Sequence, residues 1–118
     1  VQISYQGKQG YLGRDADNWG RLVGRDDATR LRLRMVDGQN YYGTDDDWWL
    51  SVGTTGTRAG YVSFYWWNNC GHPDWRYDRV TKRLTSSYSS RAGMSIRDDG
   101  YVYCWPSYPA ADVELQEV

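Results

Sequence analysis

Several segments of this 118-residue sequence resemble one another, and this internal repeat limits the fold more than any other feature. Residues 10–15 (GYLGRD) resemble residues 40–45 (NYYGTD), and further similarities run along the chain. These further pairs are residues 19–24 with 48–53, residues 50–52 with 94–96, and residues 60–65 with 100–105. Three units of about 39 residues each predict one domain over residues 1–118, with approximate repeats 1–38, 39–81 and 82–118.

Short segments of alternating polarity predict strands rather than helices. The clearest covers residues 29–36, where three apolar residues alternate with three arginines, as on the two faces of one strand. Glu, Lys and Ala, which favour helices, are scarce, whereas the 13 glycines and 13 aspartates suit tight turns. With about four short strands in each unit, the chain is predicted to be all-β.

The same alternation predicts which side chains form the core, because every second residue of a strand faces the same side. The repeat places Leu31 and Leu33 of the first unit at the positions of Val62 and Phe64 in the second, and we take the apolar side of each strand as the inner one. The expected core residues are Leu31, Leu33, Leu50, Val52, Val62, Phe64, Ile96 and Val102.

The opening of the chain, residues 1–13 (VQISYQGKQGYLG), resembles the strand, turn and Tyr-Leu pattern that begins the units of β-trefoil proteins, both fascin-like and lectin-type. A shorter version recurs at residues 41–43 (YYG), while the Gln-x-Trp motif of ricin-type lectins is absent. The resemblance covers the whole chain as a repeat pattern. It implies a β-trefoil with three degenerate repeats, and the alternative is another small β-barrel or β-sandwich.

Groups that could perform catalysis or bind a metal are sparse. The one imidazole, His72, lies near Cys70 in a turn-like segment, where close sequence neighbours seldom form a nucleophile and base pair. We therefore expect no enzyme activity. Two cysteines and one histidine do not make a closed zinc site, and the three aspartates at 45–47 suit a solvated turn, so no metal and no cofactor are expected.

Charge and hydropathy exclude two classes of partner. The formal net charge of −1 does not favour nucleic acid. No apolar run approaches the roughly 18 residues of a membrane span, and no basic and then apolar leader begins the sequence, so we expect neither membrane insertion nor a signal peptide.

The two cysteines, Cys70 and Cys104, allow two interpretations. A disulfide between them would suit a secreted protein, which favours secretion slightly. The alignment of Cys104 with Phe64 instead places its thiol in the core. The sequence does not decide between the two.

Aromatic and polar side chains concentrate in the second unit, within residues 64–77. Trp and Tyr rings can stack on the C–H faces of sugars, while carboxylates and amides can bind their hydroxyls. The third unit offers a weaker second site. The expected ligand-binding residues are Asp46, Asp47, Trp48, Trp66, Trp67, Asn68, Asn69, Trp75, Tyr103 and Trp105.

This aromatic and polar mixture predicts a noncatalytic carbohydrate-binding protein, a lectin, whose partners are glycans or glycoproteins. The alternative is a protein-binding domain such as a protease or hydrolase inhibitor, because exposed Trp, Tyr and Arg also dominate protein interfaces. The sequence leaves open the sugar, the number of sites and whether the chain forms a homo-oligomer.

Overall fold

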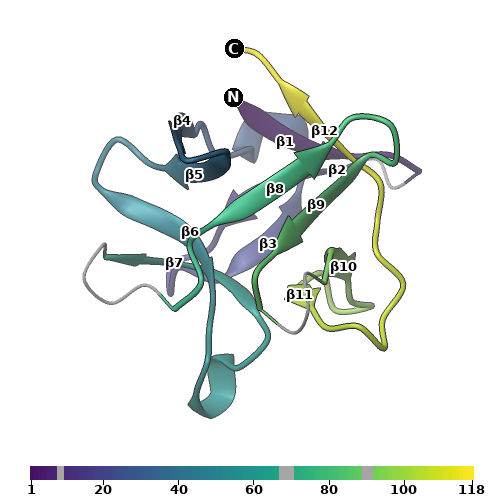
Figure 1. The fold of residues 1–118 in the computed structure, drawn as a ribbon. Helices are drawn as coiled ribbons and strands as arrows, with labels where there is room; N and C mark the ends of the chain where they lie inside the picture. Colours follow the sequence, from purple (N-terminus) through teal and green to yellow (C-terminus); the bar gives the residue numbers. More distant parts are fainter. Residues whose placement is uncertain (8–9, 67–70, 89–91) are drawn as a thin grey trace.

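The computed structural model describes residues 1–7, 10–66, 71–88 and 92–118 (Figure 1). Within these ranges the chain is all-β, with two short 3-10 turns, η1 (Arg25–Asp27) and η2 (Gly56–Arg58), and no α-helix. Accordingly, no helix of this part is long and apolar enough to cross a membrane. The strands are β1 (Gln2–Tyr5), β2 (Gly10–Arg14), β3 (Gly20–Val23), β4 (Arg32–Val36), β5 (Gln39–Gly43), β6 (Trp48–Val52), β7 (Val62–Trp66), β8 (Trp75–Asp78), β9 (Arg83–Ser86), β10 (Met94–Ile96), β11 (Val102–Cys104) and β12 (Val113–Gln116).

The strands pair antiparallel in three sheets. One sheet has the order β12-β1-β2-β3, the second consists of β10 and β11, and the third has the order β7-β6-β5-β8-β9 with β4 paired to β5. Hydrogen bonds at two places join the first and third sheets into a ring. The amide of Leu31, just before β4, donates to the carbonyl of Val1 at 2.8 Å, and the amide of Val113 donates to that of Lys82 at 2.7 Å.

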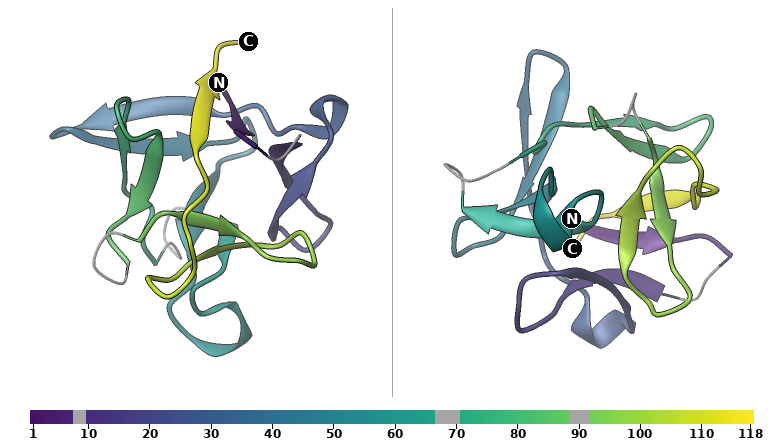
Figure 2. Two further views of the ribbon diagram at one scale, coloured as in Figure 1. Left: turned by 90° about the vertical axis from the view of Figure 1, so that its right-hand side faces the viewer. Right: turned by 90° about the horizontal axis from the view of Figure 1, so that it is seen from below.

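Three hairpins, β2–β3, β6–β7 and β10–β11, contact one another at the end of the molecule opposite the chain termini (Figure 1; Figure 2, right). Each hairpin donates one backbone hydrogen bond to the turn of the next, and all three are 2.8 Å long. The bonds run from Leu22 to Gly100, from Phe64 to Asn18, and from Cys104 to Gly60. All three acceptor residues have positive φ, at 87°, 66° and 81° respectively. The three hairpins therefore interact through equivalent positions.

Most of the expected core residues are buried. Leu31, Leu50, Val52, Val62, Phe64 and Val102 all lie in the core, and Ile96 is half-buried against it. Leu33 is an exception, because 42% of its surface is exposed, and the expectation that it lines the core is wrong. All of β4 is exposed, on both faces, because the outer part of the β4–β5 hairpin extends beyond the packed strands (Figure 2, left).

The repeat alignment explains this error. Residues 10–15 match residues 40–45 because each segment leads into the same kind of turn. The amide of Asp15 donates to the carbonyl of Trp19 at 3.1 Å, and that of Thr44 donates to the carbonyl of Trp48 at 2.8 Å. The first turn joins β2 to β3, whereas the second joins β5 to β6. The match is therefore offset by one strand, and it assigned Leu33 to the wrong position.

The expected unit boundaries fall between strands. Residues 1–38 contain β1 to β4, residues 39–81 contain β5 to β8, and residues 82–118 contain β9 to β12. The sequence analysis identified neither β5 nor β8, and β8 lies within the segment expected to bind ligand. Its alternation of Trp75 and Tyr77 with Arg76 and Asp78 is the signal that could have identified it.

Candidate functional site

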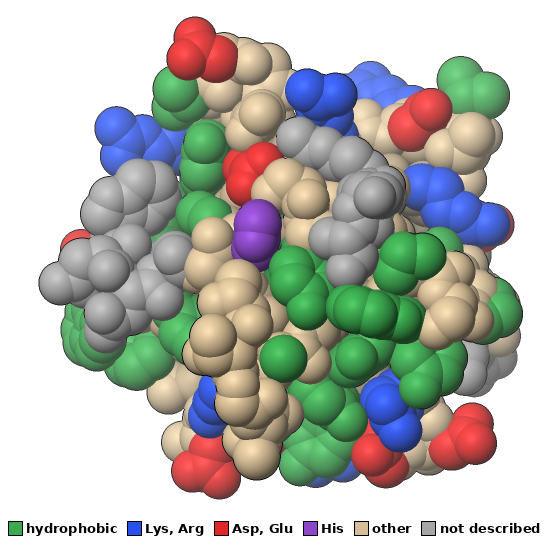
Figure 3. Space-filling view, turned by 60° about the horizontal axis from the view of Figure 1, so that its bottom comes forward, with side chains coloured by type: hydrophobic (Ala, Val, Ile, Leu, Met, Phe, Trp, Pro, Cys, Tyr) green, Lys and Arg blue, Asp and Glu red, His purple; other side chains and the backbone are tan. Residues whose placement is uncertain are grey.

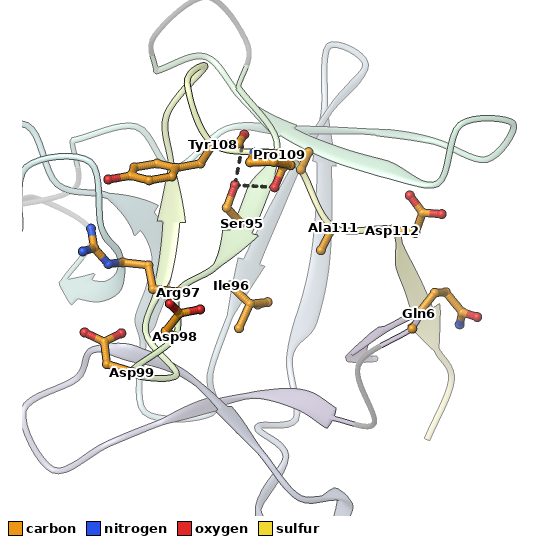
Figure 4. Close-up of a pocket in the computed structure, with 12 residues that line it drawn as sticks. Gln6, Ser95, Ile96, Arg97, Asp98, Asp99, Tyr108, Pro109, Ala111 and Asp112 are labelled. Atoms are coloured by element: carbon orange, nitrogen blue, oxygen red, sulfur yellow. Dashed lines mark hydrogen bonds between the residues drawn. The ribbon is translucent and has the colours of Figure 1, made fainter.

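A pocket of about 750 Å³ lies between the β10–β11 turn and the segment that leads into β12. We call it the β10–β11 pocket; residues 6–7, 95–99 and 108–112 line it. Figure 4 shows Arg97, Asp98, Asp99 and Tyr108 at one end, and Gln6 and Asp112 at the other.

The charged end of the pocket is built by a tight turn after β10. The amide of Arg97 donates to the carbonyl of Tyr101, and the amide of Gly100 donates back to the carbonyl of Arg97, both at 2.9 Å. Gly100 completes the turn with a φ of 87°, which an L side chain rarely adopts. A carboxylate oxygen of Asp99 accepts the amide of Tyr101 at 3.1 Å. These bonds hold Arg97, Asp98 and Asp99 together at the edge of the pocket.

The opposite wall is tied to β10 by Ser95. Its hydroxyl donates to the carbonyl of Pro109 at 2.8 Å and lies 3.3 Å from that of Tyr108 (Figure 4). The amide of Ala111 donates to the carbonyl of Met94 at 2.7 Å. The wall is thus held at several points by hydrogen bonds within the protein.

Arg97 connects the pocket to a cluster of aromatic rings. Its guanidinium lies 5.6 to 5.7 Å from the ring centroids of Tyr61, Tyr103 and Tyr108. The electrostatic interaction with Tyr61 is the largest cause that raises the pKa of Arg97 above its ordinary value. Arg97 therefore places its positive charge against three tyrosine rings, a contact that favours the cation.

The cluster, which we call the aromatic face, covers the contact between the three hairpins. Ring centroids lie 4.8 to 6.4 Å apart in tilted or edge-to-face pairs, as aromatic side chains prefer. Figure 3 shows hydrophobic side chains gathered on this side of the molecule, with Lys or Arg side chains among them. Its members are Trp19, Tyr61, Tyr88, Tyr101, Tyr103, Trp105 and Tyr108.

Two expected ligand-binding residues belong to the aromatic face. Tyr103 is half-buried between Tyr61, Trp105 and Tyr108, and burial raises its pKa. Trp105 is 39% exposed, so its ring retains a surface that a ligand could contact.

Four of the expected residues in the second unit lie close together. Asp46 and Asp47 lie in the turn between β5 and β6. Trp48 begins β6 and pairs across the strands with Trp66, with their ring centroids 4.6 Å apart. Trp66 is 47% exposed. Trp67, Asn68 and Asn69 lie outside the described residues.

Trp75 requires a correction. Its side chain is fully buried, and its indole Nε1 donates to the carbonyl of Leu50 at 3.1 Å. The ring is a central part of the core because β8 turns it inward, and it offers no surface to a ligand.

Asp46 already has protein partners. Its carboxylate accepts hydrogen bonds from the hydroxyl of Thr44 and from Arg14, the latter with both oxygens at 3.3 Å. The Thr44 hydrogen bond is the main cause that holds its pKa below the usual aspartate value. Both carboxylate oxygens of Asp46 therefore already accept hydrogen bonds within the protein, which leaves fewer positions for a ligand.

Replacing Thr44 with valine is expected to raise the pKa of Asp46 toward its ordinary value. The Thr44 hydroxyl favours the ionised form of Asp46 and so stabilises the folded protein. This stabilisation is present above the pKa that Asp46 has in the unfolded chain, and it is lost as the pH falls through the lower pKa of the folded state. NMR titration of the Asp46 carboxyl carbon measures the change, with the exposed Thr57→Val as control. An unchanged pKa would show that Arg14, rather than Thr44, determines it.

His72 belongs to a polar chain that the sequence analysis did not anticipate. Its Nδ1 lies 2.9 Å from the hydroxyl of Ser87, which in turn donates to a carboxylate oxygen of Asp74 at 2.8 Å. In hydrolases of the serine type the imidazole lies between the hydroxyl and the carboxylate. Here the hydroxyl lies between them, so His72 does not relay a proton from Ser87 to Asp74.

Cys104 is a buried free thiol, in agreement with a core position, and burial raises its pKa. Its possible partner in the sequence analysis, Cys70, lies outside the described residues. Among the residues that the structure describes, no three His, Cys, Asp or Glu side chains gather closely enough to hold a metal ion.

Comparison of the chain with protein families, with curated proteins and with solved structures finds no match.

Proposed function

We propose that this chain is a noncatalytic carbohydrate-binding protein with a β-trefoil arrangement, and that its main site is the β10–β11 pocket. The observation that supports this most is the composition of the pocket. An exposed aromatic ring, Tyr108, lies beside a cation, Arg97, and two exposed carboxylates, Asp98 and Asp99.

The three equivalent hydrogen bonds between the hairpins support the β-trefoil part of the proposal. Approximate threefold symmetry requires each hairpin to contact the next through the same positions, and the amides of Leu22, Phe64 and Cys104 do so. The ring of strands joined through Leu31 and Val113 is the second supporting feature. Together they are what a barrel closed at one end by three hairpins requires.

The chemistry of the pocket suits a sugar. A tyrosine ring can pack against the apolar face of a pyranose, while a guanidinium donates to ring and hydroxyl oxygens and carboxylates accept from hydroxyls. Ile96 and Ala111 provide an apolar floor (Figure 4). Because its walls are fixed by internal hydrogen bonds, little ordering is needed on binding.

This proposal moves the main site from the second unit to the third. The sequence analysis favoured the second unit because its aromatic residues are consecutive, but Trp75 is buried and Asp46 is partly occupied by protein partners. Trp48 and Trp66 remain candidates for a secondary site.

The order of the hydrogen-bonded groups His72, Ser87 and Asp74 supports the proposal of a noncatalytic role. The hydroxyl proton of Ser87 is directed toward Asp74, and His72 contacts the hydroxyl oxygen with Nδ1. No step of acyl transfer follows from that order of groups.

Removing either Tyr108 or Arg97 is expected to weaken glycan binding by about 5- to 100-fold, because each loses one buried contact worth about 1–3 kcal/mol. We would first identify a ligand in an unbiased glycan array, and then measure its dissociation constant by calorimetry for Tyr108→Ala and Arg97→Gln. Tyr108→Phe keeps the ring and should retain most of the affinity.

Trp66→Ala is the matched control for the position of the site, and each variant must keep the melting temperature of the parent. If Trp66→Ala weakens binding while Tyr108→Ala does not, the main site belongs to the second unit. If no glycan binds, the carbohydrate proposal is wrong.

A protein-binding role is the second candidate, and the outer part of the β4–β5 hairpin favours it. Leu33, Met35 and Val36 are exposed there by 42, 68 and 43%, next to exposed arginines. Apolar and arginine side chains on one projecting element are typical of a protein interface. The glycan array separates the two candidates, because an inhibitor domain would bind none of the glycans.

A further inference from the structure

We propose that the β8–β9 hairpin carries a subsite for an anionic group of the bound glycan, a sulfate ester or a carboxylate, held by Arg76 and Arg79. The subsite rests on the proposed carbohydrate-binding function and specifies the class of glycan. It would make the preferred ligand an acidic saccharide, with an uncharged part in the β10–β11 pocket and a charged part on the hairpin.

A second hollow, of about 610 Å³, lies over the β8–β9 hairpin and its turn. Arg76, Arg79 and Arg83 line it, together with the hydroxyl-bearing side chains of Thr81 and Thr85. Arg76 and Thr85 are direct cross-strand partners, so they share one side of the hairpin. The hydroxyl of Thr85 donates to the carbonyl of Arg76, so the groups that the hollow offers to a ligand are its cations.

Arg76 and Arg79 have no protein partner for their charge. Both are exposed, and neither guanidinium forms a hydrogen bond or ion pair with any residue that the structure describes. Arg83, in contrast, is paired with Asp112. The two free guanidinium groups can each donate two parallel hydrogen bonds to a carboxylate or sulfate, which is the geometry that arginine favours.

The carboxylate in this hollow does not neutralise them directly. Asp78 accepts the backbone amides of Val80 and Thr81 at 2.8 and 3.2 Å, and these bonds lower its pKa. Its Oδ1 is thus directed into the hairpin turn. With three guanidinium groups against the carboxylates of Asp78 and Asp112, the hollow keeps a net positive charge.

The register extends this positive side across the sheet. Val36 of β4 pairs with Gln39 of β5, so their side chains lie on the same side of the sheet. Arg34 lies on that side too, because it is two residues before Val36 and side chains alternate along a strand. Gln39 in turn lies across from Arg76, since its neighbour Asn40 pairs with Trp75. Arg34 is exposed, so a longer acidic chain would meet a further cation on the same side.

The two hollows adjoin at one ion pair. Arg83 lines the hollow on the hairpin, and its partner Asp112 lines the far end of the β10–β11 pocket (Figure 4). The backbone bond from Val113 to Lys82 holds the two segments together there. A saccharide of several rings that occupies the pocket can therefore continue over this pair to the free arginines.

The charge of the two hollows differs, and this gives the ligand an orientation. The pocket holds Asp98 and Asp99 against Arg97, so it disfavours a second anion, whereas the hairpin hollow attracts one. Nucleic acid fits less well, because its affinity for a protein depends on how many phosphates basic side chains neutralise, and this chain has a net charge of −1. Two free arginines suit one or two anionic groups on a sugar.

The test compares probes that share one backbone: dextran, dextran sulfate and carboxymethyl dextran of equal length, with a single-stranded oligonucleotide as the nucleic-acid probe. Binding is measured by calorimetry at physiological salt with the full chain. Replacing Arg76 and Arg79 together by glutamine is expected to weaken binding of the preferred anionic dextran at least about tenfold, because two charge-assisted contacts are lost.

The matched control replaces Arg25 and Arg30, which are also exposed, by glutamine, and so removes the same charge at another place on the surface. It should retain nearly all of the affinity. The double variant Arg76→Lys/Arg79→Lys keeps the charge without the planar guanidinium, so it should retain only part of the affinity. A preference for dextran sulfate or for carboxymethyl dextran supports the subsite and identifies its anion.

Three results would overturn the subsite: equal affinity of parent and Arg76/Arg79 glutamine variant, an equal loss in the Arg25/Arg30 control, or tighter binding of the oligonucleotide than of either anionic dextran. The outcome is independent of the main pocket. If dextran sulfate binding depends on Arg76 and Arg79 while no neutral glycan binds, the main site fails and the anion site remains. If a neutral glycan binds through Tyr108 and neither anionic dextran binds, only the subsite fails.

Discussion

Replacing Trp75 with alanine is expected to lower the free energy of unfolding by about 3–5 kcal/mol, the largest effect of any substitution considered for this chain. The indole is fully buried, and its removal leaves a large cavity among the strands that it contacts. It also leaves the carbonyl of Leu50 without its side-chain donor. Urea unfolding, followed by far-ultraviolet circular dichroism, measures the change.

Trp66→Ala is the control, because it removes the same side chain from a position that is 47% exposed. It is expected to cost much less. A similar loss in both variants would contradict the inward orientation of β8, and no loss in Trp75→Ala would place its ring on the surface, where the sequence analysis expected it.

Replacing Leu12 with alanine is expected to cost about 2–5 kcal/mol, because its side chain is fully buried in the core. Leu33→Ala makes the same chemical change at a position that is 42% exposed, and its effect should stay within about 0.5 kcal/mol. The comparison of the two variants tests whether Leu12 is buried and Leu33 is exposed. If Leu33→Ala were the more costly substitution, β4 would be packed against the core and the arrangement described above would be wrong.

Local patterns in the sequence predicted the strands and turns well, for a physical reason. Alternation identifies a strand because its two faces meet different environments, and residues 94–96 and 102–104 are examples. Asp15 and Thr44 identify turns because their side chains accept the amides of Trp19 and Trp48. These interactions lie within five residues and need no knowledge of the rest of the chain.

The candidate site was harder to predict because it consists of segments that are far apart. The β10–β11 pocket needs residues near 6, 97 and 110 at once, and none of its charged residues was expected to bind a ligand. One signal was available: residues 97–101 (RDDGY) resemble the turn at residues 44–48 (TDDDW), which the sequence analysis did select. Similarly, residues 76–83 (RYDRVTKR) contain four of the 14 basic residues, a local concentration that the net charge conceals.

The sequence by itself determined that the chain is all-β, where most strands lie, and that Phe64 and Val102 face inward. Only the tertiary structure decided that Leu33 is exposed and Trp75 is buried. The physical reason is that an apolar face requires a second layer to cover it, and the outer part of β4 has none among the described residues, whereas other strands enclose β8. Alternation reports that a strand has two different faces, but burial depends on which distant strands pack against them.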